Sequence, residues 1–253
     1  MSLTRRIAAA CLAAAPALAP AVADDALVAQ GRALFNDTSL SASGQYSCAT
    51  CHPATNGFEA HTTNHTYVGL DIVADGEPAG RSTPTLWNAG VRSAWGWAGT
   101  APSLEANIRG IIVNRMKGPE PTAEQLAALA AYVMQLPAPR SGHVDDDGLP
   151  VDGAPAAVER GFELFVGDGG CGTCHLVGSF DKAELEDVGT GGTFKAPSLW
   201  AVSHTGPWFH DGRHADLADA VRYMWEHHHQ RQGAPSSPTA AQLADLVAYL
   251  EAL

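Results

Sequence analysis

Apolar residues recur at helical spacing in two segments, one near the middle of the chain and one at its end. From Thr122 to Leu136, and again from Thr239 to Leu253, leucine, alanine and tyrosine return every third or fourth position, which is the spacing of one helix face. Each segment begins with a threonine, a favourable N-cap, and Glu124 lies in the first turn, where a negative charge is stabilising. We therefore predict two amphipathic helices whose apolar side chains pack in a core.

The two predicted helices close two halves of the chain that share further motifs. The helices are identical at nine of fifteen aligned positions, and each half contains, in the same order, a Gly-x-x-Leu-Phe segment, a Cys-x-x-Cys-His motif, a Pro-x-Leu-Trp segment and a tryptophan-containing turn. Such an internal repeat indicates two structural units. The stretch Pro137–Pro155, rich in proline, glycine and aspartate, separates them. We expect an N-terminal domain over 24–140, a linker over 141–157 and a C-terminal domain over 158–253.

Residues 1–23 have the features of a secretory signal peptide. Arg5 and Arg6 precede an apolar run, which ends at an Ala-x-Ala cleavage site and takes Cys11 with it on removal. The run contains two prolines and is short for a membrane span. We therefore expect export to the periplasm, and no stable membrane insertion once the signal peptide has been cleaved.

The four cysteines of the mature chain all lie in the two Cys-x-x-Cys-His motifs, Cys48–His52 and Cys171–His175. Two thiols at this spacing can each add across a vinyl group of one haem, and the adjacent histidine can reach the iron. A disulfide, a thioredoxin-like redox pair or half a zinc site also uses Cys-x-x-Cys, but the following histidine favours haem. A terminal helix laid across such a motif is typical of cytochrome c domains. We predict an all-α protein of two cytochrome c-like haem domains in tandem, with two covalently bound haem c groups held by Cys48, Cys51, His52, Cys171, Cys174 and His175.

The charge of the chain bears on its partners. Without Arg5 and Arg6 the mature chain has 13 basic and 27 acidic residues, a formal charge of −14, which argues against a nucleic-acid partner. An acidic surface would steer a basic redox partner, and ordinary solubility explains the same composition. A small electron-donor protein, either a cytochrome c or a cupredoxin, is the partner we expect.

The ligand opposite each proximal histidine separates electron transfer from catalysis. In the second half, Leu217, Ala220, Val221 and Met224 share one helix face, so Met224 points inward, either as a ligand or as a core residue. Three histidines that follow on the same helix compete with it, namely His227, His228 and His229. In the first half the candidates are His65, His61 and Met116, whereas Met134 on the terminal helix is expected to pack.

The segment Val188–Met224, together with CGTCH, resembles the C-terminal domain of bacterial dihaem cytochrome c peroxidases and their relative MauG. The first half, with CATCH, STPTLWNA and WGWAG before SLEANIRG, is similar to the N-terminal domain of the same family. This resemblance implies that the C-terminal haem transfers electrons and takes Met224 as its distal ligand. It also implies that Trp97 lies between the haems as an electron relay, with plain core packing as the alternative, and that Thr205–Pro207 form part of an interdomain calcium site.

The resemblance further implies that peroxide reacts at the N-terminal haem, close to a histidine that leaves on activation and that corresponds to His65. The chain departs from the family where a catalytic glutamate is expected, because the corresponding stretch is Asn114–Lys117, with Arg115 and Met116 at its centre. Arg115 cannot act as a base but can stabilise negative charge, and Met116 is able to occupy the sixth coordination position of the first haem. We therefore expect a peroxidase-like enzyme that reduces hydrogen peroxide; the alternatives are a non-catalytic dihaem electron-transfer cytochrome and a MauG-like oxidant of a partner protein.

Overall fold

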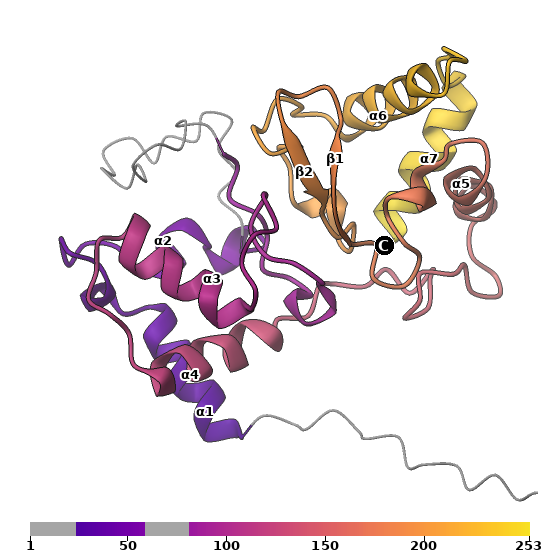
Figure 1. Ribbon diagram of the computed structural model, residues 1–253. Helices are drawn as coiled ribbons and strands as arrows, with labels where there is room; N and C mark the ends of the chain where they lie inside the picture. Colours follow the sequence, from indigo (N-terminus) through magenta and orange to yellow (C-terminus); the bar gives the residue numbers. More distant parts are fainter. Residues whose placement is uncertain (1–23, 59–80) are drawn as a thin grey trace, which may run out of the picture.

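The computed structural model describes residues 24–58 and 81–253, and its helices gather into two groups that follow each other along the chain (Figure 1). The predicted signal peptide, 1–23, lies outside the described residues. The candidate ligands His61 and His65 lie outside them as well. A single two-stranded sheet accompanies the helices within the described ranges, so the fold is dominated by helices, as expected.

The first half is built on α1 (Asp25–Phe35), which packs against α4 (Ala123–Met134). The short α2 (Cys48–Cys51), α3 (Leu104–Gly110) and a π-helical turn over Ile111–Arg115 complete it. The predicted N-cap of α4 is confirmed, because the Thr122 side chain accepts the Gln125 N–H and the Gln125 side chain accepts the Thr122 N–H. The core of this half is formed by large apolar side chains, among them Phe35, Leu40, Ile112, Leu129 and Tyr132.

The second half repeats this plan, since α5 (Ala156–Val166) packs against α7 (Ala240–Ala252). The same capping box begins α7, with Thr239 and Gln242 in place of the corresponding pair in α4. In the sequence, α6 (Leu217–Arg231) lies between α5 and α7; it begins after the N-cap Asp216 and carries the three histidines in its last turns. The core of the second half includes Phe165, Phe180, Trp200, Leu246 and Tyr249.

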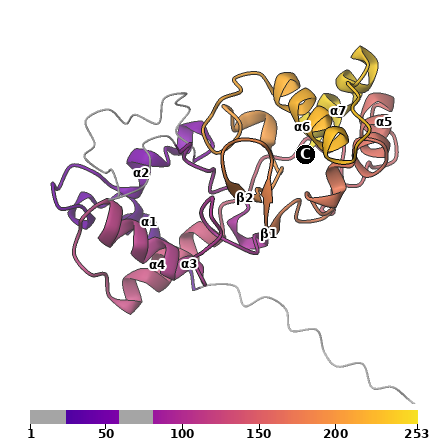
Figure 2. The same cartoon turned by 45° about the horizontal axis from the view of Figure 1, so that its top comes forward.

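A β-hairpin is the part of the second half that the helical pattern did not predict. Strands β1 (Lys182–Asp187) and β2 (Thr193–Ala196) pair antiparallel, with Glu186 opposite Phe194 and an irregularity between Lys182 and Leu185. The two views show the hairpin on the side of the second half that faces the first (Figures 1 and 2). A backbone hydrogen bond from Lys195 N–H to the Trp97 carbonyl, 3.2 Å long, joins it to the first half.

The two halves meet through side chains as well as backbone. Trp87 packs against both hydrophobic cores, and the Ser82 N–H donates a 2.6 Å hydrogen bond to the His210 carbonyl. The segment predicted as a linker also packs, because Val144 and Ala154 belong to the core of the second half, as does Ala138 just before it. Within the described ranges, no helix is long and apolar enough to cross a membrane.

The acidic turn of the linker is held by its own carboxylate. Asp145 accepts the backbone N–H groups of Asp147 and Leu149, and all three consecutive aspartates are exposed. Asp145–Asp147 therefore form a solvent-exposed turn. The Tyr249 hydroxyl donates to the Gly148 carbonyl over 2.9 Å and ties the turn to α7.

Each helix pair depends on a glycine at its closest approach. A Cβ atom at Gly161 would lie 2.0 Å from the Asp245 carbonyl oxygen and 2.6 Å from the Tyr249 Cβ, and a Cβ at Gly31 would lie 1.9 Å from the Ala128 carbonyl oxygen. Backbone atoms cannot withdraw as a flexible side chain can. The glycine of the Gly-x-x-Leu-Phe segment is therefore required in both halves for the backbones to approach.

The replacement Gly161→Ala is expected to destabilise the protein by about 1–3 kcal/mol, the usual cost of overpacking a core, because α5 must move away from α7. Chemical denaturation of the holoprotein measures the change. The exposed Glu163 on the same helix supplies the matched control, Glu163→Ala, which should stay close to the parent stability. Equal stability of the two variants would contradict the close-approach argument.

Candidate functional site

The CGTCH motif forms a single tight turn after α5. Cys171–Thr173 make one turn of 3-10 helix, and the His175 N–H donates to the Cys171 carbonyl over 2.9 Å. Gly170 enters this turn with φ +64°, and a Cβ there would fall 2.0 Å from the His228 Nε2 atom. The glycine therefore serves both the left-handed backbone and the close contact with α6.

The His175 ring is oriented by two backbone carbonyls. Its Nδ1 atom lies 3.1 Å from the Phe180 oxygen and 3.0 Å from the Pro197 oxygen, and because both partners are acceptors, Nδ1 carries the hydrogen. The lone pair is then on Nε2, the tautomer needed by a histidine that binds a metal through that atom. Burial lowers the pKa of His175, which keeps the ring neutral and able to act as a ligand.

The first motif, on α2, has the same arrangement. The His52 N–H donates to the Cys48 carbonyl over 2.9 Å, and Nδ1 of His52 donates to the Phe58 carbonyl over 2.7 Å. Burial, together with a smaller contribution from the nearby cation of Arg92, lowers the pKa of His52 to about 4. Both predicted proximal histidines are thus held in the same tautomer by a carbonyl that follows the motif.

The two phenylalanines that provide these carbonyls have left-handed backbones. Phe58 has φ +56° and Phe180 has φ +52°, a conformation that costs a non-glycine residue roughly 1–2 kcal/mol. Both side chains are buried in the cores of their halves, and burial of a phenylalanine contributes about 1.5–3 kcal/mol. Core packing therefore offsets the strain that aims each carbonyl at its histidine.

The four cysteines are free thiols in the structure. Burial raises the pKa of Cys48 and of Cys171 to about 12, and raises the pKa of Cys51 as well. A thioredoxin-like redox pair needs a thiol whose pKa is lowered, so the environment of these motifs does not suit that alternative. Within residues 24–58 and 81–253, no group of three or more His, Cys, Asp or Glu side chains is placed to hold a metal.

A cavity of about 250 Å³ opens beside CGTCH. The two cysteines and His175 line it together with Met224, which α6 contributes. Most of the other lining side chains are apolar, including Phe165, Leu199, Val221, Leu246 and Leu250, as is usual for a cofactor site. The donor set therefore fits a covalently attached haem, with an imidazole and a thioether lining the same cavity.

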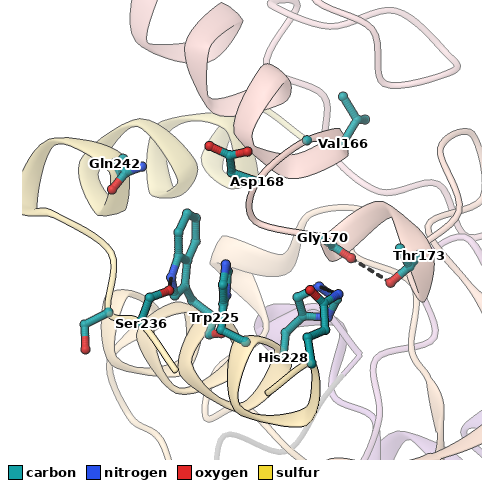
Figure 3. A pocket seen from close by; sticks show the side chains of 12 residues that line it. Val166, Asp168, Gly170, Thr173, Trp225, His228, Ser236 and Gln242 are labelled. Atoms are coloured by element: carbon teal, nitrogen blue, oxygen red, sulfur yellow. Dashed lines mark hydrogen bonds between the residues drawn. The ribbon is translucent and has the colours of Figure 1, made fainter. Parts of the chain in front are cut away.

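The histidines after Met224 lie in different surroundings. Nε2 of His227 contacts the Asp187 carbonyl at 3.1 Å, and Nδ1 of His229 contacts the Trp225 carbonyl at 2.9 Å. His228 lines the cavity and also a second, open pocket of about 550 Å³ on the outer side of the CGTCH loop, where it faces Gly170 and Thr173 (Figure 3). The structure thus places only His228 of these three at the cavity with Met224.

Trp97 lies where the two halves meet. Its indole N–H donates to the Ser82 carbonyl over 2.8 Å, and its ring contacts Phe194 and His210 edge-on, at centroid distances of 6.5 and 6.3 Å. It also lines the cavity of the second half. His210 itself stacks on Phe194 at 3.9 Å, so the aromatic contacts continue from the first half into the hairpin.

The stretch that replaces the expected glutamate lies on the π-helical turn and just after it. Met116 is buried in the first core, and Asn114 is exposed. Burial raises the pKa of the Cys51 thiol, whereas the charge of Arg115 acts on the same thiol in the opposite direction, so Arg115 lies near the first motif. The following carboxylate, Glu120, is bound to Arg109 at the surface.

A charged cluster beside the second cavity was not predicted from the sequence. It consists of the half-buried Arg92 from the first half and of the buried Asp181 and Lys195 from the hairpin region, and the exposed Ser93 is hydrogen-bonded to it. Single charged residues in loops and strands have no periodicity, and their partners are far away in the chain, so no local pattern could have identified them.

Comparisons with known proteins agree with this geometry. Residues 25–141 match the family model described as di-haem cytochrome c peroxidase. The methylamine utilization protein MauG of Methylorubrum extorquens is 29% identical, over 89% of this chain and 77% of the relative. The cytochrome c551 peroxidase of Pseudomonas aeruginosa is 26% identical, over 88% of this chain and 77% of the relative.

Two solved structures share the fold. The diheme peroxidase BthA from Burkholderia thailandensis superposes with a TM-score of 0.67 at 17% identity, over 91% of this chain and 86% of that chain. A MauG-like protein associated with microbial copper homeostasis gives 0.67 at 22% identity, over 91% and 88%. With both Cys-x-x-Cys-His motifs in place, these matches agree with the resemblance seen in the sequence and support the assignment of the chain to the superfamily of di-haem cytochrome c peroxidases and MauG.

Proposed function

We propose that the protein is a periplasmic dihaem c-type cytochrome that reduces hydrogen peroxide at an N-terminal haem, with electrons received through a C-terminal haem. The observation that supports this most is the matched pair of histidines, His52 and His175, each with Nδ1 bound to a carbonyl. Met224 on the cavity of the second half adds a difference between the two sites. A His/Met pair raises the potential of a haem, which suits the second site to electron entry.

We assign the attachment residues as the sequence predicts, in two cytochrome c-like domains in tandem. Cys48 and Cys51 would hold one haem with His52, and Cys171 and Cys174 the other with His175. When bound, the two irons would supply the one-electron redox chemistry. The protein contributes the ring tautomers, the apolar walls and the separation of the two sites.

Trp97 is the residue we propose between the two sites. Its contacts with Phe194 and His210 and its bond to Ser82 hold the ring at the junction of the halves. A fixed aromatic ring there would shorten the gap that an electron crosses. The proposed donor is a small protein with a basic face, a cytochrome c or a cupredoxin, attracted by the net negative charge of this chain.

Reduction of one hydrogen peroxide to two waters consumes two electrons and two protons, so a proton must be delivered while the O–O bond breaks. A side chain that does this typically contributes about 10²–10⁴-fold in rate. Arg115 lies near Cys51 and would stabilise negative charge without acting as a base. We therefore expect slower turnover than in an enzyme with a carboxylate at this position.

A second candidate function is electron transfer alone. It is favoured by the absence of a carboxylate in Asn114–Lys117 and by Met116, which is buried in the first core and would close the first site as a ligand. Oxidation of a partner protein is a third candidate, supported by the similarity to the methylamine utilization protein MauG. Calcium at Thr205–Pro207 and a ligand role for His65 remain predictions.

Replacing both cysteines of one motif should remove one haem. The double variants Cys48→Ala/Cys51→Ala and Cys171→Ala/Cys174→Ala are each expected to lose one covalent haem, because each motif supplies both thioether bonds of its own group. Intact-mass measurement of the exported protein reports the number bound. Cys11→Ala is the matched control and should retain both haems; a double variant whose mass still corresponds to its polypeptide plus two haems would exclude haem attachment at that motif.

Replacing Met224 should lower one reduction potential and leave the other. For Met224→His we expect at least a tenfold shift toward the oxidised form, about 59 mV for a one-electron couple, because the thioether favours the reduced iron. Spectroelectrochemical titration measures both potentials. Met134, which is 44% exposed, gives the control Met134→Leu. Identical potentials in the two variants would show that Met224 is not a ligand of the iron.

Spin state separates the enzyme from the electron-transfer cytochrome. In the half-reduced protein we expect one high-spin, five-coordinate haem, together with consumption of added hydrogen peroxide. Electron paramagnetic resonance and absorption spectra give the spin state, and peroxide loss in the presence of a reduced donor gives the activity. Two low-spin haems in both redox states, with no peroxide loss, would favour the electron-transfer function.

A further inference from the structure

Two cations and one carboxylate are gathered where the halves meet. Lys195 Nζ lies 2.8 Å from Asp181 Oδ1, and the two side chains are only 6% and 0% exposed. The second carboxylate oxygen of Asp181 accepts the backbone N–H of Ser93 over 2.8 Å and its hydroxyl over 2.7 Å. Asp181 is therefore fully engaged, and its one negative charge is balanced by Lys195.

Arg92, next to Ser93, adds a positive charge that this carboxylate does not neutralise. One of its terminal nitrogens, Nη2, donates to the carbonyls of Thr85 and Trp87 over 2.6 and 2.9 Å. Its Nε atom is shielded from solvent and has no partner among the described residues. Burial lowers the pKa of Arg92 to about 10, so this side chain is still a cation at neutral pH. Burial also lowers the pKa of Lys195, whereas its ion pair with Asp181 acts in the opposite direction and favours the charged ammonium.

An excess buried positive charge is costly. Removing one ion from water costs several kcal/mol unless an opposite charge and hydrogen bonds compensate it. Carbonyl groups satisfy part of the Arg92 guanidinium but carry no net charge, and a lysine ammonium can donate three hydrogen bonds, of which Asp181 receives one. The cluster therefore has an unmatched charge and unused donors, which is the chemistry of an anion site.

The position of the cluster identifies the anion. Arg92 and Lys195 both line the cavity that His175, Met224 and the two cysteines of CGTCH also line. A haem is the group that this donor set fits, and a haem has two propionate carboxylates at one edge. Hydrogen bonds from an arginine or a lysine to a carboxylate are charge-assisted and are therefore among the stronger hydrogen bonds in proteins.

We propose that Arg92 and Lys195 together bind a propionate of the haem attached at Cys171–His175, so that the first half of the chain completes the site of the second haem. This inference rests on the proposed haem in that cavity. Asp181, held by Ser93, orients Lys195 and limits the positive charge of the pair. Because reduction adds one negative charge to the haem, the excess cation stabilises the reduced form and raises the potential of this haem.

The test is a spectroelectrochemical titration of the holoprotein and of three variants. Arg92→Gln and Lys195→Met each remove one cation at nearly constant volume, and each should reduce the ratio of reduced to oxidised second haem tenfold or more at a fixed potential, about 59 mV for one electron. Asp181→Asn removes the opposing charge and should raise that potential. The second haem is recognised as the one whose potential changes in Met224→His.

Arg160 provides the matched control, because its guanidinium is 56% exposed and pairs with Asp245 at the surface. Arg160→Gln removes the same charge from the chain but should leave both potentials unchanged. Equal potentials in Arg92→Gln and Arg160→Gln, with two haems bound, would overturn the inference. A protein that lacks the haem at Cys171–His175, as shown by its mass, would instead contradict the proposed function.

A measurement on the parent protein avoids variants that do not fold. In a crystal structure of the holoprotein, a propionate oxygen should lie within about 3.2 Å of Arg92 Nε and of Lys195 Nζ. A propionate that is directed to solvent, with a water or a buffer anion at the two cations, would overturn the inference. Arg92→Lys, which retains the charge, should keep most of the potential that Arg92→Gln loses.

Discussion

Each half depends on the hydrogen bond from Nδ1 of the histidine that follows the second cysteine to a backbone carbonyl shortly after the motif, and His175 has the Pro197 carbonyl as a second acceptor. This bond fixes the tautomer and directs Nε2 away from the protein backbone. The carbonyl belongs to a phenylalanine in the left-handed region, Phe58 or Phe180, whose side chain is locked in the aromatic core, for example by the contact of Phe180 with Trp200 at 5.0 Å. The orientation of a ligand is therefore controlled by hydrophobic packing several residues away.

The two halves share the same residues where helix backbones approach each other closely, and they differ around their candidate sites. Gly31 and Gly161 occupy the same place in their helix pairs, and the capping boxes of α4 and α7 are identical in kind. The halves then diverge around their sites: the second has a hairpin and Met224 on its cavity, and the first has a π-helical turn at Ile111–Arg115. A duplicated scaffold with different surroundings for the two histidines suits a division of roles.

The junction between the halves is polar, although both cores are hydrophobic. Trp97, Arg92 and Ser93 from the first half reach the hairpin and the wall of the second cavity. Interactions of this kind are directional, so they determine how the halves are oriented in a way that apolar contact alone would not. They also bring positive charge to the cavity in which we propose a haem, whose charge would change by one on reduction.

The sequence alone determined the features that depend on neighbours along the chain. Helix caps and apolar periodicity are local, so the helices at Thr122 and Thr239 could be predicted; the spacing of Cys-x-x-Cys-His is local as well, and the haem attachment residues are proposed from it. The tertiary structure decided which carbonyl holds each histidine, which of His227–His229 faces the cavity, and that Arg92 meets Lys195 across about a hundred residues of sequence. The first two relations depend on packing within each half and the third on how the halves pack against each other, and no periodicity in the chain records either.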